Sequence, residues 1–130
     1  MGLSAFFSVG TGAFLGAVMR WFFGIWLNPL LPALPLGTLA ANLLGGFVMG
    51  LAMGLFAQFQ SLTPEVRLFV TTGFLGGLTT FSTFSAETVT LMLRQQYAWT
   101  LAIIGAHLLG SLLMTLLGIG LVQLLFRGAA

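Results

Sequence analysis

The sequence predicts an all-α membrane protein with four transmembrane helices, and composition and segment length both lead to this fold class. Of the 130 residues, 58% are hydrophobic and only 5% are charged, whereas soluble domains carry about 25% charged residues. The mean hydropathy is +1.10. Apolar segments of roughly 20 residues, the length that crosses a bilayer core, follow one another with short connections. We therefore expect a single membrane domain over residues 1–130.

The bounds of the first two helices follow from proline. The first helix is expected at about residues 4–27, because Asn28 and Pro29 begin a loop in which two further prolines follow. The second helix is expected at about residues 36–58, directly after the last of these prolines.

A capping signal and a polar turn set the bounds of the other two helices. Thr63 is an N-cap candidate and is followed by proline, so the third helix should begin near Glu65 and continue to about residue 93. The polar run from Arg94 to Gln96 then forms a turn before a fourth helix at about residues 97–126.

The arginines predict the orientation of the chain in the membrane. With four spans, Arg67 and Arg127 lie on one side, and Arg20 and Arg94 lie on the other. Orientation follows the Lys/Arg excess near the ends of the spans, so this tie predicts insertion both ways up and assembly of antiparallel pairs. The alternative is that Arg20 lies too deep to count, which leaves a weak bias.

Size and small residues point to a homodimer. Four helices offer one interior seam, and a seam filled by Leu, Phe and Met holds no continuous polar path, so a single copy makes a poor pore. Small residues four apart let membrane helices approach closely, either within one chain or between two copies. Such spacing occurs at Gly12 and Gly16, at Gly46, Gly50 and Gly54, and at Ala106 and Gly110.

Several functional classes do not fit this composition. The chain has no cysteine, which excludes disulfides and thiolate metal sites. It has no Lys/Arg cluster, so nucleic acid is not an expected partner. His107, Ser111 and Glu87 do not make a catalytic triad merely because the residue types coincide, and no enzyme activity is expected.

Residues 73–85, with the sequence GFLGGLTTFSTFS, mix three glycines with five hydroxyl side chains inside an apolar span. Gly76 and Gly77 each lower helix propensity by about 1 kcal/mol relative to alanine, so we expect the third helix to break there. An unwound turn frees backbone carbonyls, notably those of Gly76 and Thr79, which suit Na⁺ if two copies present them across a two-fold axis. Alternatively, the glycines only kink the helix against a neighbour.

Two phenylalanines follow this expected break. Phe81 and Phe84 are three residues apart and share a helix face, with Ser82 and Thr83 offering hydroxyl donors beside them. The rim of an aromatic ring is electropositive, so these ring edges suit a small desolvated anion. The alternative is ordinary packing.

Polar side chains also lie deep in the second and fourth expected helices. Asn42 needs a hydrogen-bond partner there, and its amide either joins two helices or donates to a passing anion. His107 and Ser111 lie four residues apart, in a polar stripe that forms either a pathway wall or a helix-to-helix contact.

Two charged residues complete the candidates. Glu87 is an intramembrane carboxylate and so a functional candidate, although a pair with Arg20 or a helix cap explains it equally well. Arg20 lies near the end of the first expected helix, where it either snorkels or draws anions into a vestibule.

These residues carry a resemblance to a known family. The runs GFLGGLTTFSTFSAE and PLGTLAANLLGG, the arginine in MRW and the run GSLLMT resemble the Fluc (CrcB) family of microbial fluoride channels over essentially the whole chain. The resemblance implies an antiparallel, dual-topology homodimer in the bacterial plasma (inner) membrane. It further implies two fluoride pores, a central Na⁺ on the two-fold axis, and passive fluoride export that protects the cell.

Site roles follow from the same resemblance. The Na⁺ would be held by carbonyls of Gly76 and Thr79. The fluoride path would be lined by Asn42, Phe81, Phe84, Ser82, Thr83, His107 and Ser111, and Arg20 and Glu87 would lie at its vestibule or ends. The competing hypothesis is a small, dual-topology, proton-coupled exporter of cationic drugs, for which Glu87 is the one suitable carboxylate.

Overall fold

The computed structural model describes residues 2–127, and every regular element within this range is helical. The elements are α1 (Leu3–Leu27), the 3₁₀ turn η1 (Asn28–Leu30), α2 (Leu36–Gln58), α3 (Pro64–Leu68), the π-helix η2 (Phe69–Leu75), α4 (Gly76–Leu78), α5 (Phe81–Leu93) and α6 (Tyr97–Leu125). By length and composition, α1 with η1, α2 and α6 are each able to cross a membrane. The third expected span is present over 64–93 but is divided, so no single helix in it reaches that length.

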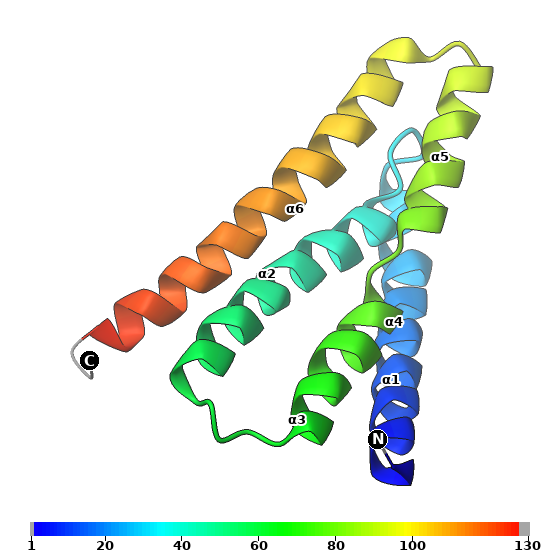
Figure 1. Cartoon of the computed structure of the whole chain (residues 1–130). Helices are drawn as coiled ribbons and strands as arrows, with labels where there is room; N and C mark the ends of the chain where they lie inside the picture. The colour runs from blue at the N-terminus through cyan, green and yellow to red at the C-terminus, as the bar shows by residue number, and fades with distance from the viewer. Residues whose placement is uncertain (1, 128–130) are drawn as a thin grey trace.

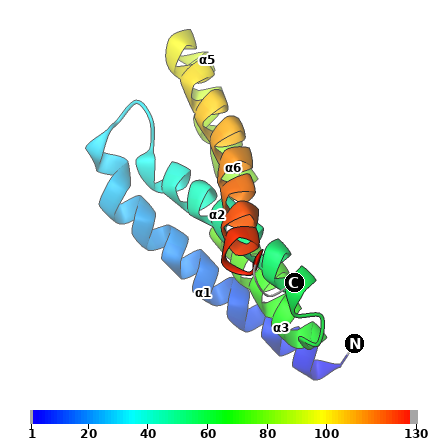
Figure 2. The same ribbon diagram turned by 90° about the vertical axis from the view of Figure 1, so that its left-hand side faces the viewer.

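The helices form two packed groups that α2 connects. Figure 1 shows α2 running alongside α6 in the same direction, while α1 runs alongside α3, η2 and α4. Beyond the break, α5 leaves α1 and packs against α6. Figure 2 shows α1 and α6 on opposite flanks, and α2 contacts both of them. The break therefore lies where the third span passes from one group to the other.

Backbone-to-backbone packing joins α1 to the third span. A Cβ on Gly12 would lie 2.5 Å from the Phe69 carbonyl oxygen and 2.7 Å from the Phe74 amide nitrogen. Gly16 meets the carbonyl of Phe74 in the same way, and Gly77 meets that of Ala13. Only glycine lets these backbones come so close.

The α2–α6 contact is built in the same manner. A Cβ on Gly46 would lie 2.8 Å from the Ser111 carbonyl oxygen, and one on Gly50 would lie 3.0 Å from the Gly118 Cα. Gly54 packs on Val122. The small-residue spacings of the sequence thus serve packing within one chain, which was the alternative to packing between copies.

Two buried clusters lie on the two sides of the break. Ala41, Leu75 and Leu78 form one cluster, between α2 and the part of the third span before the break. Leu34, Leu91 and Ile103 form the other, among the first loop, α5 and α6. Leu78 and Ile103 are fully buried.

The start of the third span confirms its sequence prediction. The Thr63 hydroxyl accepts a hydrogen bond from the Val66 N–H at 3.3 Å, and Pro64 is the first helical residue. The turn before α6 is also where it was expected. There the Gln96 N–H donates to the Leu91 carbonyl at 2.9 Å, and Gln95 has a positive φ of 59°, a combination typical of a Schellman helix end.

The break is confirmed, but its expected position is wrong by two to three residues. Gly76 and Gly77 are helical, as the bounds of α4 show, and the extended residues are Thr79 (ψ 153°) and Thr80 (ψ 116°). Low helix propensity is therefore not what opens the helix at this point. Gly77 instead provides the close approach to Ala13.

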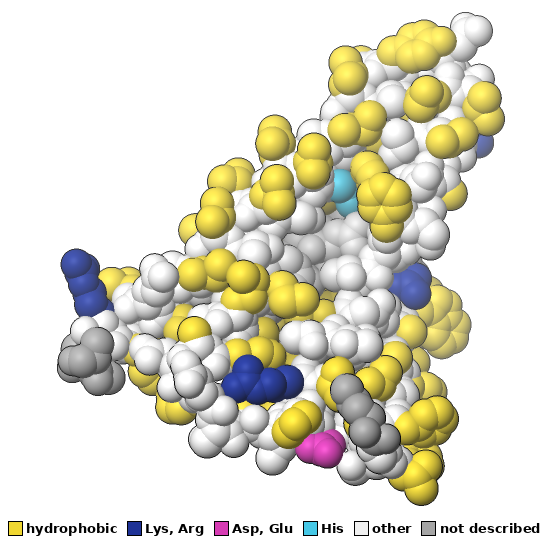
Figure 3. Space-filling view, viewed as in Figure 1, with side chains coloured by type: hydrophobic (Ala, Val, Ile, Leu, Met, Phe, Trp, Pro, Cys, Tyr) yellow, Lys and Arg dark blue, Asp and Glu magenta, His cyan; other side chains and the backbone are white. Residues whose placement is uncertain are grey.

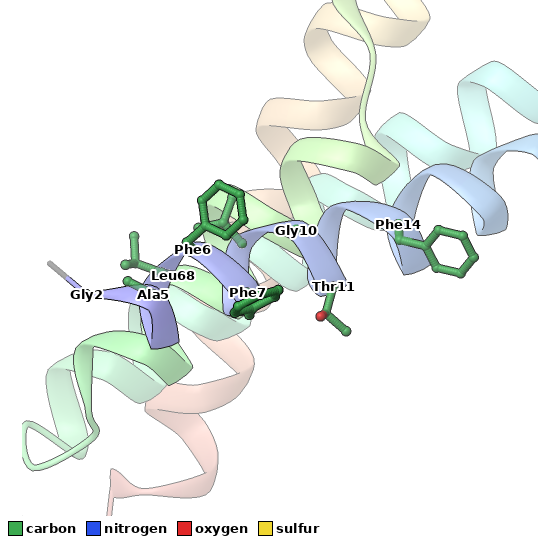
Figure 4. A pocket seen from close by; sticks show the side chains of 9 residues that line it. Gly2, Ala5, Phe6, Phe7, Gly10, Thr11, Phe14 and Leu68 are labelled. Carbon is green, nitrogen blue, oxygen red and sulfur yellow. The ribbon is translucent and has the colours of Figure 1, made fainter.

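The outer face of α1 is apolar. Figure 4 shows Phe6 and Phe14 pointing away from the helix, beside an open groove of about 830 Å³ that Phe7, Thr11 and Leu68 also line. Phe6 is 70% exposed and Phe14 is 67% exposed. Such a surface is compatible with acyl chains rather than with water.

Close packing on α1 gives the first testable prediction. Gly12→Ala should lower the free energy of unfolding by about 1–3 kcal/mol, because its new methyl group collides with backbone atoms that cannot move aside. Gly10→Ala is the matched control in the same helix, since a Cβ there meets nothing within 4 Å. Thermal unfolding of both variants in detergent measures the difference, and equal midpoints would contradict this account of the interface.

Candidate functional site

The site lies at the break in the third span, where side chains compete with the helix for its backbone donors. The Thr80 N–H donates to Asn42 Oδ1 at 2.8 Å, and the Thr83 N–H donates to the Thr80 hydroxyl at 3.1 Å. In an unbroken α-helix these two N–H groups would bond to the carbonyls of Gly76 and Thr79. At the break, the carbonyls of Gly76 and Thr79 therefore lose the N–H donors that an unbroken helix would give them.

The neighbouring carbonyls have other donors. The Gly77 carbonyl accepts from Arg20 Nε at 3.2 Å, and the Thr80 carbonyl accepts from Asn42 Nδ2 at 3.2 Å. The Leu75 carbonyl accepts from the Thr79 N–H at 3.0 Å. Gly76 and Thr79 are therefore among the residues at the break whose carbonyl oxygens lose their helical donors.

This donor set limits which cation fits. Neutral carbonyl oxygens are hard ligands that suit alkali and alkaline-earth ions. No group of three or more His, Cys, Asp or Glu side chains lies together in the part of the chain that the structure describes. Of the metal ions, the carbonyl oxygens at the break therefore suit a hard alkali or alkaline-earth cation.

A cavity of about 470 Å³ opens beside the break and brings most of the expected site residues together. Figure 3 shows the histidine side chain in a hollow of this face, between hydrophobic side chains. The expected residues that line the cavity are Asn42, Gly76, Thr79, Phe81, Phe84, His107 and Ser111. No Asp, Glu, Lys or Arg is among its lining residues.

The two phenylalanines meet edge to face at the wall of this cavity. Their ring centroids are 5.6 Å apart with an interplanar angle of 61°. Phe81 is 79% exposed, whereas Phe84 is half-buried and lies 4.7 Å from the His107 ring, centroid to centroid. One copy of the chain therefore leaves Phe81 uncovered.

Asn42 joins α2 to both the break and α6. Besides its two bonds to the Thr80 backbone, its Nδ2 lies 2.9 Å from His107 Nδ1. His107 is 4% exposed, and its Nε2 is buried without a hydrogen-bond partner. Asn42 therefore makes helix-to-helix contacts and also lines the cavity.

The hydroxyl residues divide into two sets. Ser111 lines the cavity, whereas Ser82 and Thr83 do not. Thr80 Oγ1 lies 3.3 Å from Ser82 Oγ and donates to Thr83 Oγ1 at 3.1 Å. In one copy of the chain, Thr80 is therefore the N-cap of α5, and the Ser82 and Thr83 hydroxyls contact its side chain.

The two charged candidates lie outside the cavity lining. Glu87 Oε2 accepts from the Thr38 hydroxyl at 2.6 Å, while Glu87 Oε1 is buried without a hydrogen-bond partner. Arg20 lies beside the break rather than free in a vestibule, because its Nε donates to the Gly77 carbonyl. Glu87 thus pairs with Thr38 and not with Arg20.

Sequence reasoning missed Thr80 and Thr38. Thr80 has a local signal, because threonine is a favoured N-cap residue. Its hydroxyl accepts a hydrogen bond from the N–H of Thr83, three residues later, as an N-cap side chain does. Thr38 has no such signal, because its partner Glu87 is 49 residues away and only the folded chain brings the two together.

The chain is similar in sequence to known proteins over most of its length. Residues 7–119 match the family model described as CrcB-like protein, Camphor Resistance (CrcB). A protein of Nitrosospira multiformis is 66% identical over 119 residues, which is 92% of this chain and 93% of the relative. A protein of Thiobacillus denitrificans is 55% identical over 116 residues, or 89% and 94% of the two chains. Both relatives are named fluoride-specific ion channel FluC. The chain belongs to the CrcB family.

Proposed function

We propose that this protein is a fluoride-selective channel that carries F⁻ passively out of the cell and so protects it from fluoride. The observation that carries the proposal is the cavity at the break, whose wall combines Phe81, Phe84, Asn42, His107 and Ser111 with no charged side chain. The relatives named as fluoride channels match it over most of their length.

The wall chemistry suits a small anion that must also leave. Electropositive ring edges and polar N–H or O–H groups replace part of the hydration shell of the ion. A fixed arginine or lysine in the wall would hold the ion too strongly to let it pass. The lining of this cavity meets both requirements.

Passive transport is sufficient for export. Neutral HF enters from an acidic exterior and ionises inside, where F⁻ accumulates. A membrane potential that is negative inside then drives the anion outward with about 2.3 kcal/mol per charge per 100 mV. The chain is a multi-pass bacterial membrane protein, and the plasma (inner) membrane is where such a potential acts.

A second copy is part of the proposal. The cavity of one chain is open, and the 79% exposed Phe81 lies on its wall. A partner packed over this face would close the cavity and cover the ring. An antiparallel homodimer would do so twice, which gives two symmetric fluoride paths.

Dual topology rests on the near balance of arginines between the two sides. Arg67 and Arg127 lie toward one side and Arg94 toward the other. Arg20 reaches the Gly77 carbonyl near the break, so its charge counts less than that of a residue at a span end. The remaining bias is a single charge.

A structural Na⁺ on the two-fold axis completes the proposal. Gly76 and Thr79 would hold it through their carbonyl oxygens, two from each copy. The ion would offset the negative ends of the two interrupted helices and would link the copies.

Purified protein in liposomes tests the function. We expect fluoride efflux with little chloride efflux, and we expect Phe81→Ile or Asn42→Ala to abolish it. Glu87→Gln should preserve the flux, because the glutamine oxygen still accepts from Thr38. Equal chloride flux would contradict fluoride selectivity. Proton-coupled drug transport that is lost in Glu87→Gln would instead establish the drug-exporter hypothesis, which the relatives do not favour.

Reporters fused to the C-terminus test the topology. When the protein is expressed without a partner protein, we expect activity from both kinds of reporter. One kind works only outside the inner membrane, and the other works only inside. Three lysines added after Arg127 should shift the population to one orientation, because they end the charge balance. A single orientation in the unmodified chain would contradict dual topology.

Replacement of Na⁺ tests the ion. Exchange of Na⁺ for N-methylglucamine should lower fluoride flux and weaken the dimer, since that cation is too large for carbonyl coordination. Size-exclusion chromatography in detergent measures the dimer fraction independently of flux. A dimer and a flux that are both unchanged without Na⁺ would contradict the structural ion.

A further inference from the structure

The aromatic side chains that carry a polar atom are gathered in two short stretches of the chain. The sequence holds three tryptophans and one tyrosine. Trp21 and Trp26 lie in the last two turns of α1, and Tyr97 and Trp99 lie in the first turn of α6. Each pair is thus placed at the end of a helix that is able to cross a membrane.

Both stretches belong to the same end of the molecule. Leu34, in the loop after α1, packs in one buried cluster with Leu91 near the end of α5 and Ile103 in the second turn of α6. Figures 1 and 2 show this loop and the turn between α5 and α6 toward the same end of the protein. All the tryptophan and tyrosine of the chain is therefore at one end.

These rings face out of the protein. Trp21 and Trp26 are each 63% exposed, and Tyr97 is 61% exposed. The exposed Phe22 ring stacks on both indoles, with ring centroids 5.6 Å from Trp21 and 5.4 Å from Trp26 and interplanar angles of 22° and 13°. The end of α1 thus presents three stacked rings on its outer surface.

The opposite end of the molecule has phenylalanine instead. Phe6 and Phe7 meet edge to face at the start of α1, and Phe59 and Phe126 do so where α2 and α6 end. A phenylalanine ring has no polar atom, whereas indole carries an N–H donor and tyrosine a hydroxyl. The two ends therefore differ in hydrogen-bonding capacity rather than in aromatic content.

We propose that Trp21, Trp26, Tyr97 and Trp99 form an anchor for lipid headgroups at one end of the chain only. Rings with an apolar body and a polar atom collect where acyl chains meet headgroups. There the N–H and O–H groups reach ester carbonyl and phosphate oxygens of the lipid. The partner is lipid rather than protein, because the exposed rings lie at the ends of membrane-crossing helices, at the depth of these acceptors.

The consequence for the assembly rests on the proposed antiparallel dimer and deepens it. In a parallel pair both anchors would lie at one membrane surface, and the other surface would meet phenylalanine alone. Two opposed copies place one anchor at each surface. Lipid headgroups then hold the dimer from both sides, which fixes the depth of the two broken spans.

Tryptophan fluorescence tests the anchor directly, because all three tryptophans belong to it. Purified wild-type protein is reconstituted in lipids whose acyl chains carry bromine, a contact quencher, either near the headgroup or near the chain end. We expect the larger loss of fluorescence with bromine near the headgroup. A larger loss with bromine near the chain end would overturn the proposal.

A reference variant calibrates this depth scale. Leu113 is 60% exposed near the middle of α6 and does not line the cavity. Leu113→Trp, in a chain whose own tryptophans are replaced by phenylalanine, should show the opposite order of quenching. The same order as in the wild-type protein would overturn the assignment of the natural tryptophans to the headgroup level.

A second variant removes the polar atoms and keeps the rings: Trp21→Phe, Trp26→Phe, Tyr97→Phe and Trp99→Phe combined. Leu30 is 67% exposed in η1, and the chain has no cysteine, so Leu30→Cys can carry a polarity-sensitive dye at this end. Dye emission should shift to shorter wavelength in the combined variant, because the unanchored end moves toward hydrocarbon. An unchanged emission would overturn the proposal.

The matched control changes rings at the other end. Phe6→Leu with Phe7→Leu removes two exposed aromatic rings that have no polar atom, so the dye on Leu30→Cys should keep its emission. An equal shift in this control would overturn the anchor, because loss of any ring would then have the same effect. The wild-type quenching decides the proposal even if the combined variant fails to fold.

Labelling of Leu30→Cys in sealed liposomes tests the two-surface arrangement separately. A polymer maleimide that cannot cross the membrane is added outside, and intact dimers are separated by electrophoresis in mild detergent. We expect one label on each dimer, and two after the liposomes are opened. Dimers with none or two before opening would overturn the placement of one anchor at each surface. Absence of fluoride efflux would overturn the channel function, which the quenching experiment does not measure.

Discussion

Backbone groups in hydrocarbon need partners inside the protein, and the rest of this structure depends on how that need is met at one interruption. A helix that opens inside a membrane leaves N–H and C=O groups unsatisfied, each at a cost of several kcal/mol. Here Asn42 bonds both the N–H and the carbonyl of Thr80, and Arg20 bonds the Gly77 carbonyl. The break is supported because side chains from two neighbouring helices replace some of the bonds that the helix gives up.

Glycine packing makes those replacements reachable. Gly12 and Gly16 bring α1 against the backbone of the third span, so the arginine one turn after Gly16 lies beside the break. On the other side, Gly46 and Gly50 hold α2 against α6, and Asn42, one turn before Gly46, then meets His107 at 2.9 Å. Packing and site are thus consequences of the same small residues. For this reason, Gly12→Ala should also disturb the contact between Arg20 and the Gly77 carbonyl.

Local signals foretold much of this fold, and distant contacts account for the remainder. Prolines, Thr63 and the polar turn at Gln95 marked the helix ends, and seven expected site residues line one cavity. The position of the break did not follow from propensity, because helix opening is decided by competition from Asn42, which lies 38 residues away from Thr80. The Thr38–Glu87 contact likewise has no sign in the neighbouring sequence. Such contacts depend on which helices meet.

One interruption exposes helix ends of opposite partial charge. Before the break the helix ends at carbonyls, which carry partial negative charge, and after it α5 begins with N–H groups, which carry partial positive charge. Gly76 and Thr79 lie on the carbonyl side, while Phe81 and Phe84 follow on the first turn of α5. A cation and an anion would then be bound a few residues apart with no formal charge on either set of ligands. Such sites bind ions by orientation of dipoles, so they depend on the exact path of the backbone. Because Asn42 bonds both the N–H and the carbonyl of Thr80, a change at Asn42 should disturb that path before a change at any residue that only lines the cavity.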